Sequence, residues 1–175
     1  PAGVFKYFEE ICQVPRPSKK EEKMIAYLKA FGAKHNLETK VDEAGNVLIK
    51  KPATPGKENL QTVVLQSHID MVCEKNNDVQ HDFLTDPIET EIDGEWLKAK
   101  GTTLGADNGI GVATELAILA DDSIEHGPLE CLFTVDEETG LTGAFALQEG
   151  FMSGDILLNL DSEDEGEIFI GCAGG

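Results

Sequence analysis

Four apolar runs of this chain each end at an acidic residue, and one of them also at a histidine. Apolar residues throughout a short run are typical of buried strands, and in α/β sheets the loops at the carboxyl ends of strands carry the functional residues. Repetition of this pattern along one chain indicates a single site assembled from several strands. We interpret it as a metal-dependent active site. The four run ends are His68-Ile69-Asp70, Asp107, Asp136-Glu137-Glu138 and Asp161.

Helix and strand patterns alternate along the chain. Apolar spacing predicts helices over residues 5–12 and 18–31, and Ser18 with Glu21 predicts a capping box at the start of the second helix. Turn residues between alternating apolar positions predict hairpins at 39–49 and 89–98. The alternation as a whole predicts an α/β fold. The remaining expected elements are strands at 62–65, 129–135, 155–160 and 167–170 and helices at 109–119 and 141–148.

The charge balance disfavours some classes of partner. The chain has 33 acidic and 14 basic residues, which gives a formal net charge of −19. Such a charge repels phosphate backbones and acidic lipid surfaces, so we expect neither nucleic acid nor a membrane as partner. No apolar run approaches the length of about 18 residues that marks a membrane-spanning helix. Cationic metals are the more natural ligands.

The cysteines and the start of the chain indicate a compartment. Cys12, Cys73, Cys131 and Cys172 form no Cys-x-x-Cys pair, which disfavours a thiolate zinc site or a compact disulfide framework. Residues 1–5 do not resemble a secretory signal peptide, because no basic segment precedes a long apolar stretch. We therefore expect a cytoplasmic protein with free thiols.

The spacing of His68 and Asp70 suits a metal ligand and its partner. Residues i and i+2 of an extended segment point the same way, and a metal-bound imidazole usually donates its other ring N–H to a carboxylate. A surface histidine beside an acid is the alternative. The glycines around Asp107 could be mistaken for a phosphate-binding loop, but Asp107 would occupy the anion position and no Gly-Lys-Ser/Thr follows. A cation fits Asp107 better, with a plain glycine-rich helix entry as the alternative.

The remaining acids include one group of three. Adjacent carboxylates repel unless a metal or a raised pKa separates their roles, as for a metal ligand beside a general base. Asp136-Glu137-Glu138 suits such a pair of roles, with a solvated acidic turn as the alternative. Asp161 starts a segment that superficially resembles a calcium-binding loop, but its twelfth position is Cys172 and strands are expected on both sides. We reject an EF-hand and retain Asp161 as a ligand candidate.

Taken together, these motifs resemble the M20 family of di-zinc metallopeptidases in their order and spacing. The resemblance is carried by His68-x-Asp70, residues 105–108, residues 136–140 and Asp161. The amino-acid sequences of residues 67–72 and 101–109 are similar to those of the dipeptidases in this family that cleave Xaa-His substrates, β-Ala-His among them. The resemblance implies a zinc-exopeptidase-like fold, with a mixed sheet flanked by helices.

The resemblance also implies the roles of the metal ligands. His68 and Asp161 would hold one Zn²⁺, Asp107 would bridge two Zn²⁺, and Glu138 would hold the second. Co²⁺ or Mn²⁺ could replace Zn²⁺ at a site of histidine and carboxylate ligands.

Two further residues receive catalytic roles from the same resemblance. Asp70 would orient His68, and Glu137 would act as the general base that activates water between the metals. The peptide bond between Asp107 and Asn108 is expected to be cis, as is common in such enzymes.

The family pattern contains parts that we do not find in residues 1–175. These are a further histidine ligand from a C-terminal catalytic segment and a lid domain that contacts substrate and often dimerises. We therefore expect residues 1–175 to form the N-terminal part of the catalytic domain and to be inactive alone, and the whole protein to be a homodimer through its lid. Two alternatives stay open for its function. One is an M20-type aminopeptidase or N-acyl amino acid deacylase, and the other is a non-catalytic metal-binding interaction module, against which an intact Glu137 argues.

Overall fold

The computed structural model describes residues 1–162 and 166–171, and its centre is a mixed sheet of five strands. The strand order is β1-β2-β6-β3-β7. β1 with β2 and β2 with β6 pair antiparallel, whereas β3 is parallel to both of its neighbours, β6 and β7. The expected mixed sheet is therefore confirmed. The strand bounds are β1 Glu38–Val41, β2 Val47–Lys51, β3 Val63–His68, β6 Leu129–Thr134 and β7 Ile156–Asn159.

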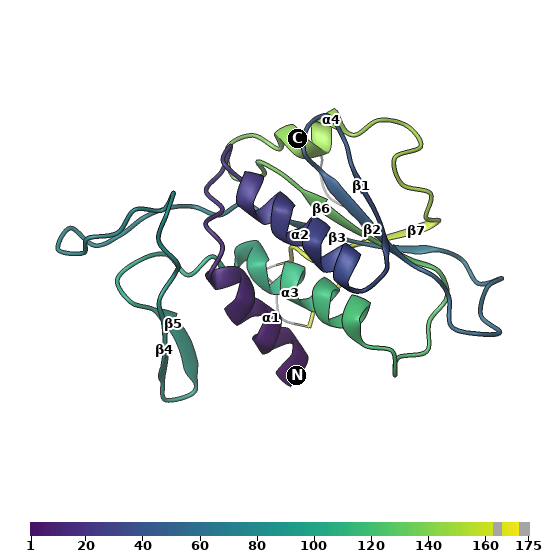
Figure 1. The fold of residues 1–175 in the computed structure, drawn as a ribbon, viewed down its shortest axis with the longest axis horizontal. Helices are drawn as coiled ribbons and strands as arrows, with labels where there is room; N and C mark the ends of the chain where they lie inside the picture. Colours follow the sequence, from purple (N-terminus) through teal and green to yellow (C-terminus); the bar gives the residue numbers. More distant parts are fainter. Residues whose placement is uncertain (163–165, 172–175) are drawn as a thin grey trace.

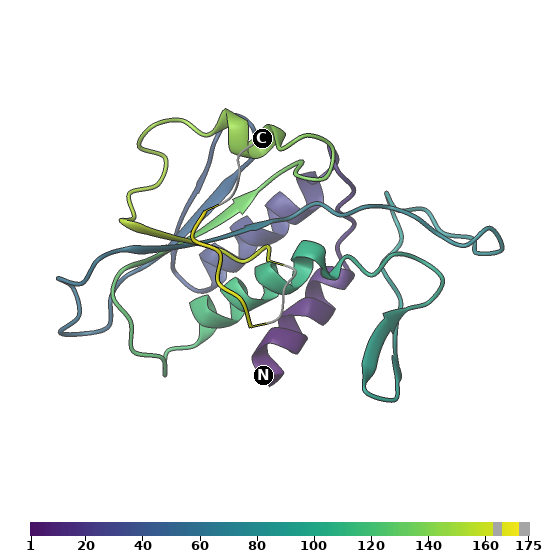
Figure 2. The ribbon, with the colours of Figure 1, turned by 180° about the vertical axis from the view of Figure 1, so that it is seen from behind.

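Three helices cover one face of this sheet (Figure 1): α1 Ala2–Cys12, α2 Glu22–Lys34 and α3 Ala106–Ala120. The main core lies between these helices and the sheet and includes Phe8, Ile11, Leu28, Leu116 and Phe133. Turned by 180°, Figure 2 brings the opposite face forward, where a smaller cluster of Leu48, Val64 and Leu132 packs against residues of the chain after α4 Thr142–Ala146. The flanked α/β arrangement agrees with the expectation. None of the described helices combines the length and apolarity needed to cross a bilayer.

The predicted hairpin near Gly94 is confirmed and forms a separate sheet of two strands. β4 Thr90–Asp93 and β5 Trp96–Ala99 pair antiparallel, and the hairpin projects from the body of the molecule (Figure 1). Gly94 has a φ of 63°, a left-handed conformation that glycine adopts without steric cost.

The predicted capping box is wrong. α2 starts at Glu22, and its N-cap residue Glu21 makes no side-chain capping hydrogen bond. Ser18 and Glu21 instead contact the acidic loops described below. A capping pattern specifies local geometry only, and here more distant partners compete for the same side chains.

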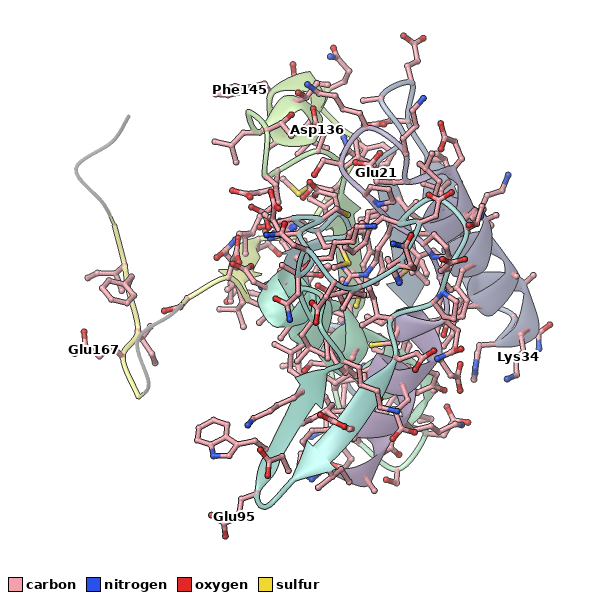
Figure 3. All side chains as sticks on the ribbon, turned by 90° about the vertical axis from the view of Figure 1, so that its left-hand side faces the viewer. Glu21, Lys34, Glu95, Asp136, Phe145 and Glu167 are labelled. Carbon is pink, nitrogen blue, oxygen red and sulfur yellow. The ribbon has the colours of Figure 1, made fainter. Side chains whose placement is uncertain are left out.

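The predicted strand at 167–170 is also wrong. The segment forms no strand, and Ile168 and Ile170 are 90% and 101% exposed. In Figure 3 the part around the labelled Glu167 stands away from the body of the molecule. An apolar pattern alone does not make a strand, because a strand also needs the backbone of a partner strand and a face to bury.

The cysteines agree with the expectation as far as the structure describes them. Cys12 and Cys131 are buried and Cys73 is half-buried, all as free thiols, and Cys172 lies outside the described residues.

Candidate metal centre

The carboxyl ends of three neighbouring parallel strands bring the predicted site residues together. His68 is the last residue of β3 and lies opposite Thr134, the last residue of β6. Glu137 and Glu138 therefore follow immediately beyond the level of His68, and Asp161 follows β7 on the other side of β3. Asp107 comes from the first turn of α3, which packs on β3. This edge is where α/β sheets bind their ligands.

His68 is at the centre of these side chains. Its Nε2 atom lies 3.1 Å from Asp107 Oδ1, 3.8 Å from Asp161 Oδ1 and 3.9 Å from Glu137 Oε2. Ligand atoms of His68, Asp107 and Glu138 also lie within 4.8 Å of one another. One imidazole nitrogen and several carboxylate oxygens thus face a common point.

Asp70 lies behind His68 and is completely buried. Its Oδ1 atom is 3.2 Å from His68 Nδ1, a close contact that falls outside hydrogen-bond geometry. Asp70 Oδ1 accepts a hydrogen bond from the backbone N–H of Glu137 (3.0 Å), and Oδ2 accepts one from Glu138 N–H (3.2 Å) and one from the Ser18 hydroxyl (2.7 Å). Asp70 therefore connects His68 to the loop that carries both glutamates.

These contacts shift the pKa values of both members of the pair. Burial raises the pKa of Asp70, but His68, Ser18 and the two backbone N–H groups outweigh burial and lower it to about 2. Burial lowers the pKa of His68, but Asp70, Asp161 and Asp107 outweigh it and raise that pKa to about 9. Without a cation, a proton on His68 offsets the surrounding negative charge, and a metal ion would take its place.

The carboxylates around His68 are crowded. Burial raises the pKa values of Glu138 and Asp161, and the negative charges of Asp107 and Glu137 raise both further, against the lowering effect of His68. Among the described residues, no lysine or arginine forms an ion pair with these acids. A set of one imidazole nitrogen and several carboxylate oxygens suits Zn²⁺, Co²⁺ or Mn²⁺. The residues present therefore fit the divalent cations that the sequence led us to expect.

The turn into α3 places Asp107 and also tethers Asp161. Gly105 has a φ of 69°, and Asp107 and Asn108 have non-helical backbone angles within the first turn. The peptide bond between Asp107 and Asn108 is cis, as expected. The buried Asn108 donates from Nδ2 to Asp161 Oδ1 (2.9 Å) and to the carbonyl of Leu160 (2.8 Å).

The first acid of the 136–138 group is part of the loop architecture. Asp136 is buried, with a φ of 49°, and accepts hydrogen bonds from the hydroxyls of Thr139 (2.6 Å) and Thr142 (2.5 Å). Its backbone N–H donates to Glu21 Oε1 at 3.0 Å, and Figure 3 labels both residues. Asp136 thereby shapes the turn from which Glu137 and Glu138 project. This group is therefore no merely solvated acidic turn.

Sequence reasoning missed the side chains that support the centre: Arg16, Ser18, Glu21 and Asn108. For one of these residues, Arg16, the sequence contained a feature that could have drawn attention to it. Arg16 is the only arginine of the chain and lies between two prolines. The others are common in turns and helix starts, so their spacing alone does not mark them.

A pocket of about 230 Å³ adjoins the centre at Glu137 and Asp161. Apolar side chains form much of its wall, so it could receive an uncharged part of a ligand beside the carboxylates. A larger hollow of about 490 Å³ between α1 and the end of α3 contains none of the predicted site residues. The apolar lining of the first pocket comprises Leu132, Val135, Leu141, Ala144, Leu147, Met152 and Leu157.

Comparison with known proteins identifies the family. A curated relative, the cytosol non-specific dipeptidase of Escherichia coli K12, is 54% identical over 175 residues, which is 100% of this chain and 36% of that protein. The crystal structure of aminoacylhistidine dipeptidase from Vibrio alginolyticus has 57% identity and a TM-score of 0.96, over 98% of this chain and 35% of that one. The structure of aminopeptidase PepT from Bacillus cereus has 26% identity and a TM-score of 0.79, over 93% and 44% of the respective chains. The sequence model described as Peptidase family M20/M25/M40 matches residues 64–172. The chain therefore belongs to this peptidase family.

Proposed function

We propose that the whole protein containing this chain hydrolyses dipeptides, including Xaa-His dipeptides such as β-Ala-His, with the help of bound metal ions. The observation that carries the proposal is the position of Glu137, whose carboxylate lies 3.9 Å from His68 Nε2 at the edge of an apolar pocket. The two dipeptidases that share more than half of their aligned residues with this chain support the substrate class. Because the chain spans 36% and 35% of those proteins, activity and substrate are proposed for the whole protein.

Four side chains would hold two cations, Zn²⁺ in the first instance and Co²⁺ or Mn²⁺ as alternatives. His68 and Asp161 would bind one, Glu138 would bind the other, and Asp107 would bridge them. The short distances from His68 Nε2 to Asp107 and Asp161 support a cation shared by these three side chains. Glu138 also has a ligand atom within 4.8 Å of those of His68 and Asp107, and its assignment to the second cation follows the family resemblance. Such cations, when bound, polarise a scissile carbonyl and lower the pKa of a water molecule between them.

Glu137 would act as the general base. It would accept the proton of the attacking water and later deliver it to the leaving amine. The backbone N–H of Glu137 donates a hydrogen bond to Asp70, which fixes the backbone of this residue. Its side chain is 31% exposed, so the carboxylate remains accessible to solvent and substrate. Asp70 would keep the His68 ring oriented, so that Nε2 faces the cation.

The substitution Glu137→Gln in the whole protein tests this assignment. Because the amide cannot accept a proton, we expect both metals to be retained while kcat for β-Ala-His falls by about 10²- to 10⁴-fold. Metal content and kcat are measured on the same preparation. The exposed Glu9 of α1 offers a matched control, and Glu9→Gln should change neither quantity.

Two results would contradict the proposal. Near-normal turnover by Glu137→Gln would exclude Glu137 as the base, and absence of bound metal from the active wild type would exclude the metal centre. A wild type that cleaves an N-acetyl amino acid in preference to β-Ala-His would instead be a deacylase of the same family.

A further inference from the structure

Arg16, the only arginine of the chain, connects two segments of the candidate metal centre. Its side chain is buried, with the residue 2% exposed. Nη1 donates hydrogen bonds to the carbonyl oxygens of Ile69 (3.1 Å) and Asp70 (3.0 Å), and Nη2 donates one to the carbonyl of Gly105 (2.5 Å). One guanidinium group therefore bridges the loop after β3 and the turn before α3.

The bridged segments carry two of the proposed ligands. Ile69 directly follows His68, and Gly105 lies two residues before Asp107. His68 Nε2 and Asp107 Oδ1 must approach each other to share a cation, and they lie 3.1 Å apart. The rigid guanidinium fork sets the separation of the two backbones from which these side chains project.

Two glycines, Gly105 and Gly109, leave the space that the guanidinium group of Arg16 occupies. A Cβ atom at Gly105 would lie 2.5 Å from Arg16 Nη2, and one at Gly109 would lie 2.7 Å from the same atom. Real side chains do not approach so closely, so any larger residue at either position would push the guanidinium aside. The turn into α3 is therefore shaped around Arg16.

The hydrogen-bonding partners of Arg16 are backbone carbonyls rather than carboxylates. Burial of an ionised group is unfavourable unless it gains such partners or nearby opposite charge. Asp70 contributes negative charge in the same region, with its carbonyl in direct contact with Nη1. An apolar residue would avoid the cost of burying a charge but could not connect the two segments.

We propose that Arg16 is a positioning residue of the metal centre, which holds the segments of His68 and Asp107 at the spacing that lets them share a cation. This inference rests on the metal centre proposed above.

The chain offers a matched control in Lys51. Lys51 is also a buried cation, 8% exposed, and it donates to the carbonyl oxygens of Asp121 (2.7 Å) and Ile118 (3.2 Å) at the far end of α3. Its loss should affect stability in a similar way, without a direct connection to the ligands.

The test compares Arg16→Met, Arg16→Lys and Lys51→Met with the wild type of the whole protein. Each metal-free protein is titrated with Co²⁺, the visible absorption spectrum of the bound ion is recorded, and the affinity is measured by competition with a chelator. Circular dichroism and urea unfolding report the fold and the stability. Arg16→Lys keeps the charge and most of the volume, so it remains informative if Arg16→Met does not fold.

We expect both Arg16 variants to bind Co²⁺ about 10- to 100-fold more weakly, as for other groups that position metal ligands, and with an altered spectrum. The single ammonium of lysine cannot reproduce the fork that reaches both segments. Lys51→Met should lose stability but keep the affinity and spectrum of the wild type.

Wild-type affinity and spectrum in a folded Arg16 variant would overturn the positioning role while leaving the proposed function intact. An equal loss of affinity in Lys51→Met would overturn it as well, because the effect would then follow general stability. Failure of the wild type itself to bind Co²⁺ would overturn the proposed metal centre and this inference together.

Discussion

The two sides of the candidate metal centre are built differently. The side chains of His68 and Asp70 are 1% and 0% exposed, and Asp70 accepts three hydrogen bonds from three other residues. On the other side, the side chain of Asp107 is 62% exposed and that of Asp161 is 24% exposed. The fold therefore positions the imidazole in advance, whereas the more exposed carboxylates repel one another until a cation joins them. The difference suggests that metal binding orders mainly the carboxylate side.

Removal of the metal should change how stability depends on pH, and this is the largest effect that we expect. In the metal-free protein the folded-state pKa of His68, about 9, lies above its ordinary value of 6.5. The protonated form therefore stabilises the fold fully below pH 6.5, and this contribution, on the order of 3 kcal/mol, is lost as the pH rises through 9. With Zn²⁺ bound, the neutral imidazole is the ligand and this loss should disappear.

Urea unfolding of the whole protein from pH 6 to 10, with a chelator and with Zn²⁺, measures this difference. His68→Gln supplies the control, since its metal-free stability should lack the decrease. Identical pH profiles with and without Zn²⁺ would show that His68 does not exchange a proton for the metal.

The substitution Asp70→Asn tests the pre-positioned side of the centre. The amide can present an N–H to His68 Nδ1 and cannot compensate a positive charge, so metal affinity should fall by about 10- to 100-fold with the fold intact. Zn²⁺ affinity by chelator competition is the measurement. Asp78→Asn, at an exposed acid, should retain wild-type affinity. Unchanged affinity in Asp70→Asn would mean that His68 needs no carboxylate behind it.

A smaller effect is expected from Ser18, because Asp70 would keep its two backbone donors. Ser18→Ala removes one hydrogen bond to a charged group and should lower the free energy of unfolding by about 1.5 kcal/mol. Ser18→Asp separates this contact from a helix cap. Aspartate is a good N-cap residue but would place a second carboxylate against Asp70, so it should be less stable than Ser18→Ala. The free energies of unfolding of both variants are measured with urea. A wild-type value for Ser18→Asp would show that Ser18 acts as a helix cap after all.

Much of the fold could be predicted from the sequence because its signals are local. Alternation and turn residues indicated both hairpins, and apolar runs indicated β3, β6 and β7. The strand predicted at 167–170 shows the limit of such signals, since its apolar residues have no partner strand among the described residues. Periodicity reports which face of a segment is apolar, but only the rest of the chain decides whether that face is covered.

The candidate site likewise has features that the sequence predicts and features that only the tertiary structure reveals. The sequence by itself predicted where the candidate ligands and base lie, because an acid or histidine shortly after an apolar strand is expected at the edge of the sheet. His68, Glu137, Glu138 and Asp161 do follow β3, β6 and β7 at that edge, whereas Asp107 reaches it from the first turn of α3. Their roles as ligands and base are proposals. Only the tertiary structure decided that Asp136 supports the loop while Glu137 and Glu138 are left to face His68. The same holds for Ser18, which contacts Asp70, and for Arg16, which bridges two distant segments. The physical reason is that the side chains of Ser18 and Arg16 find their partners across 52 to 89 residues of chain, a distance closed only by strand pairing and helix packing.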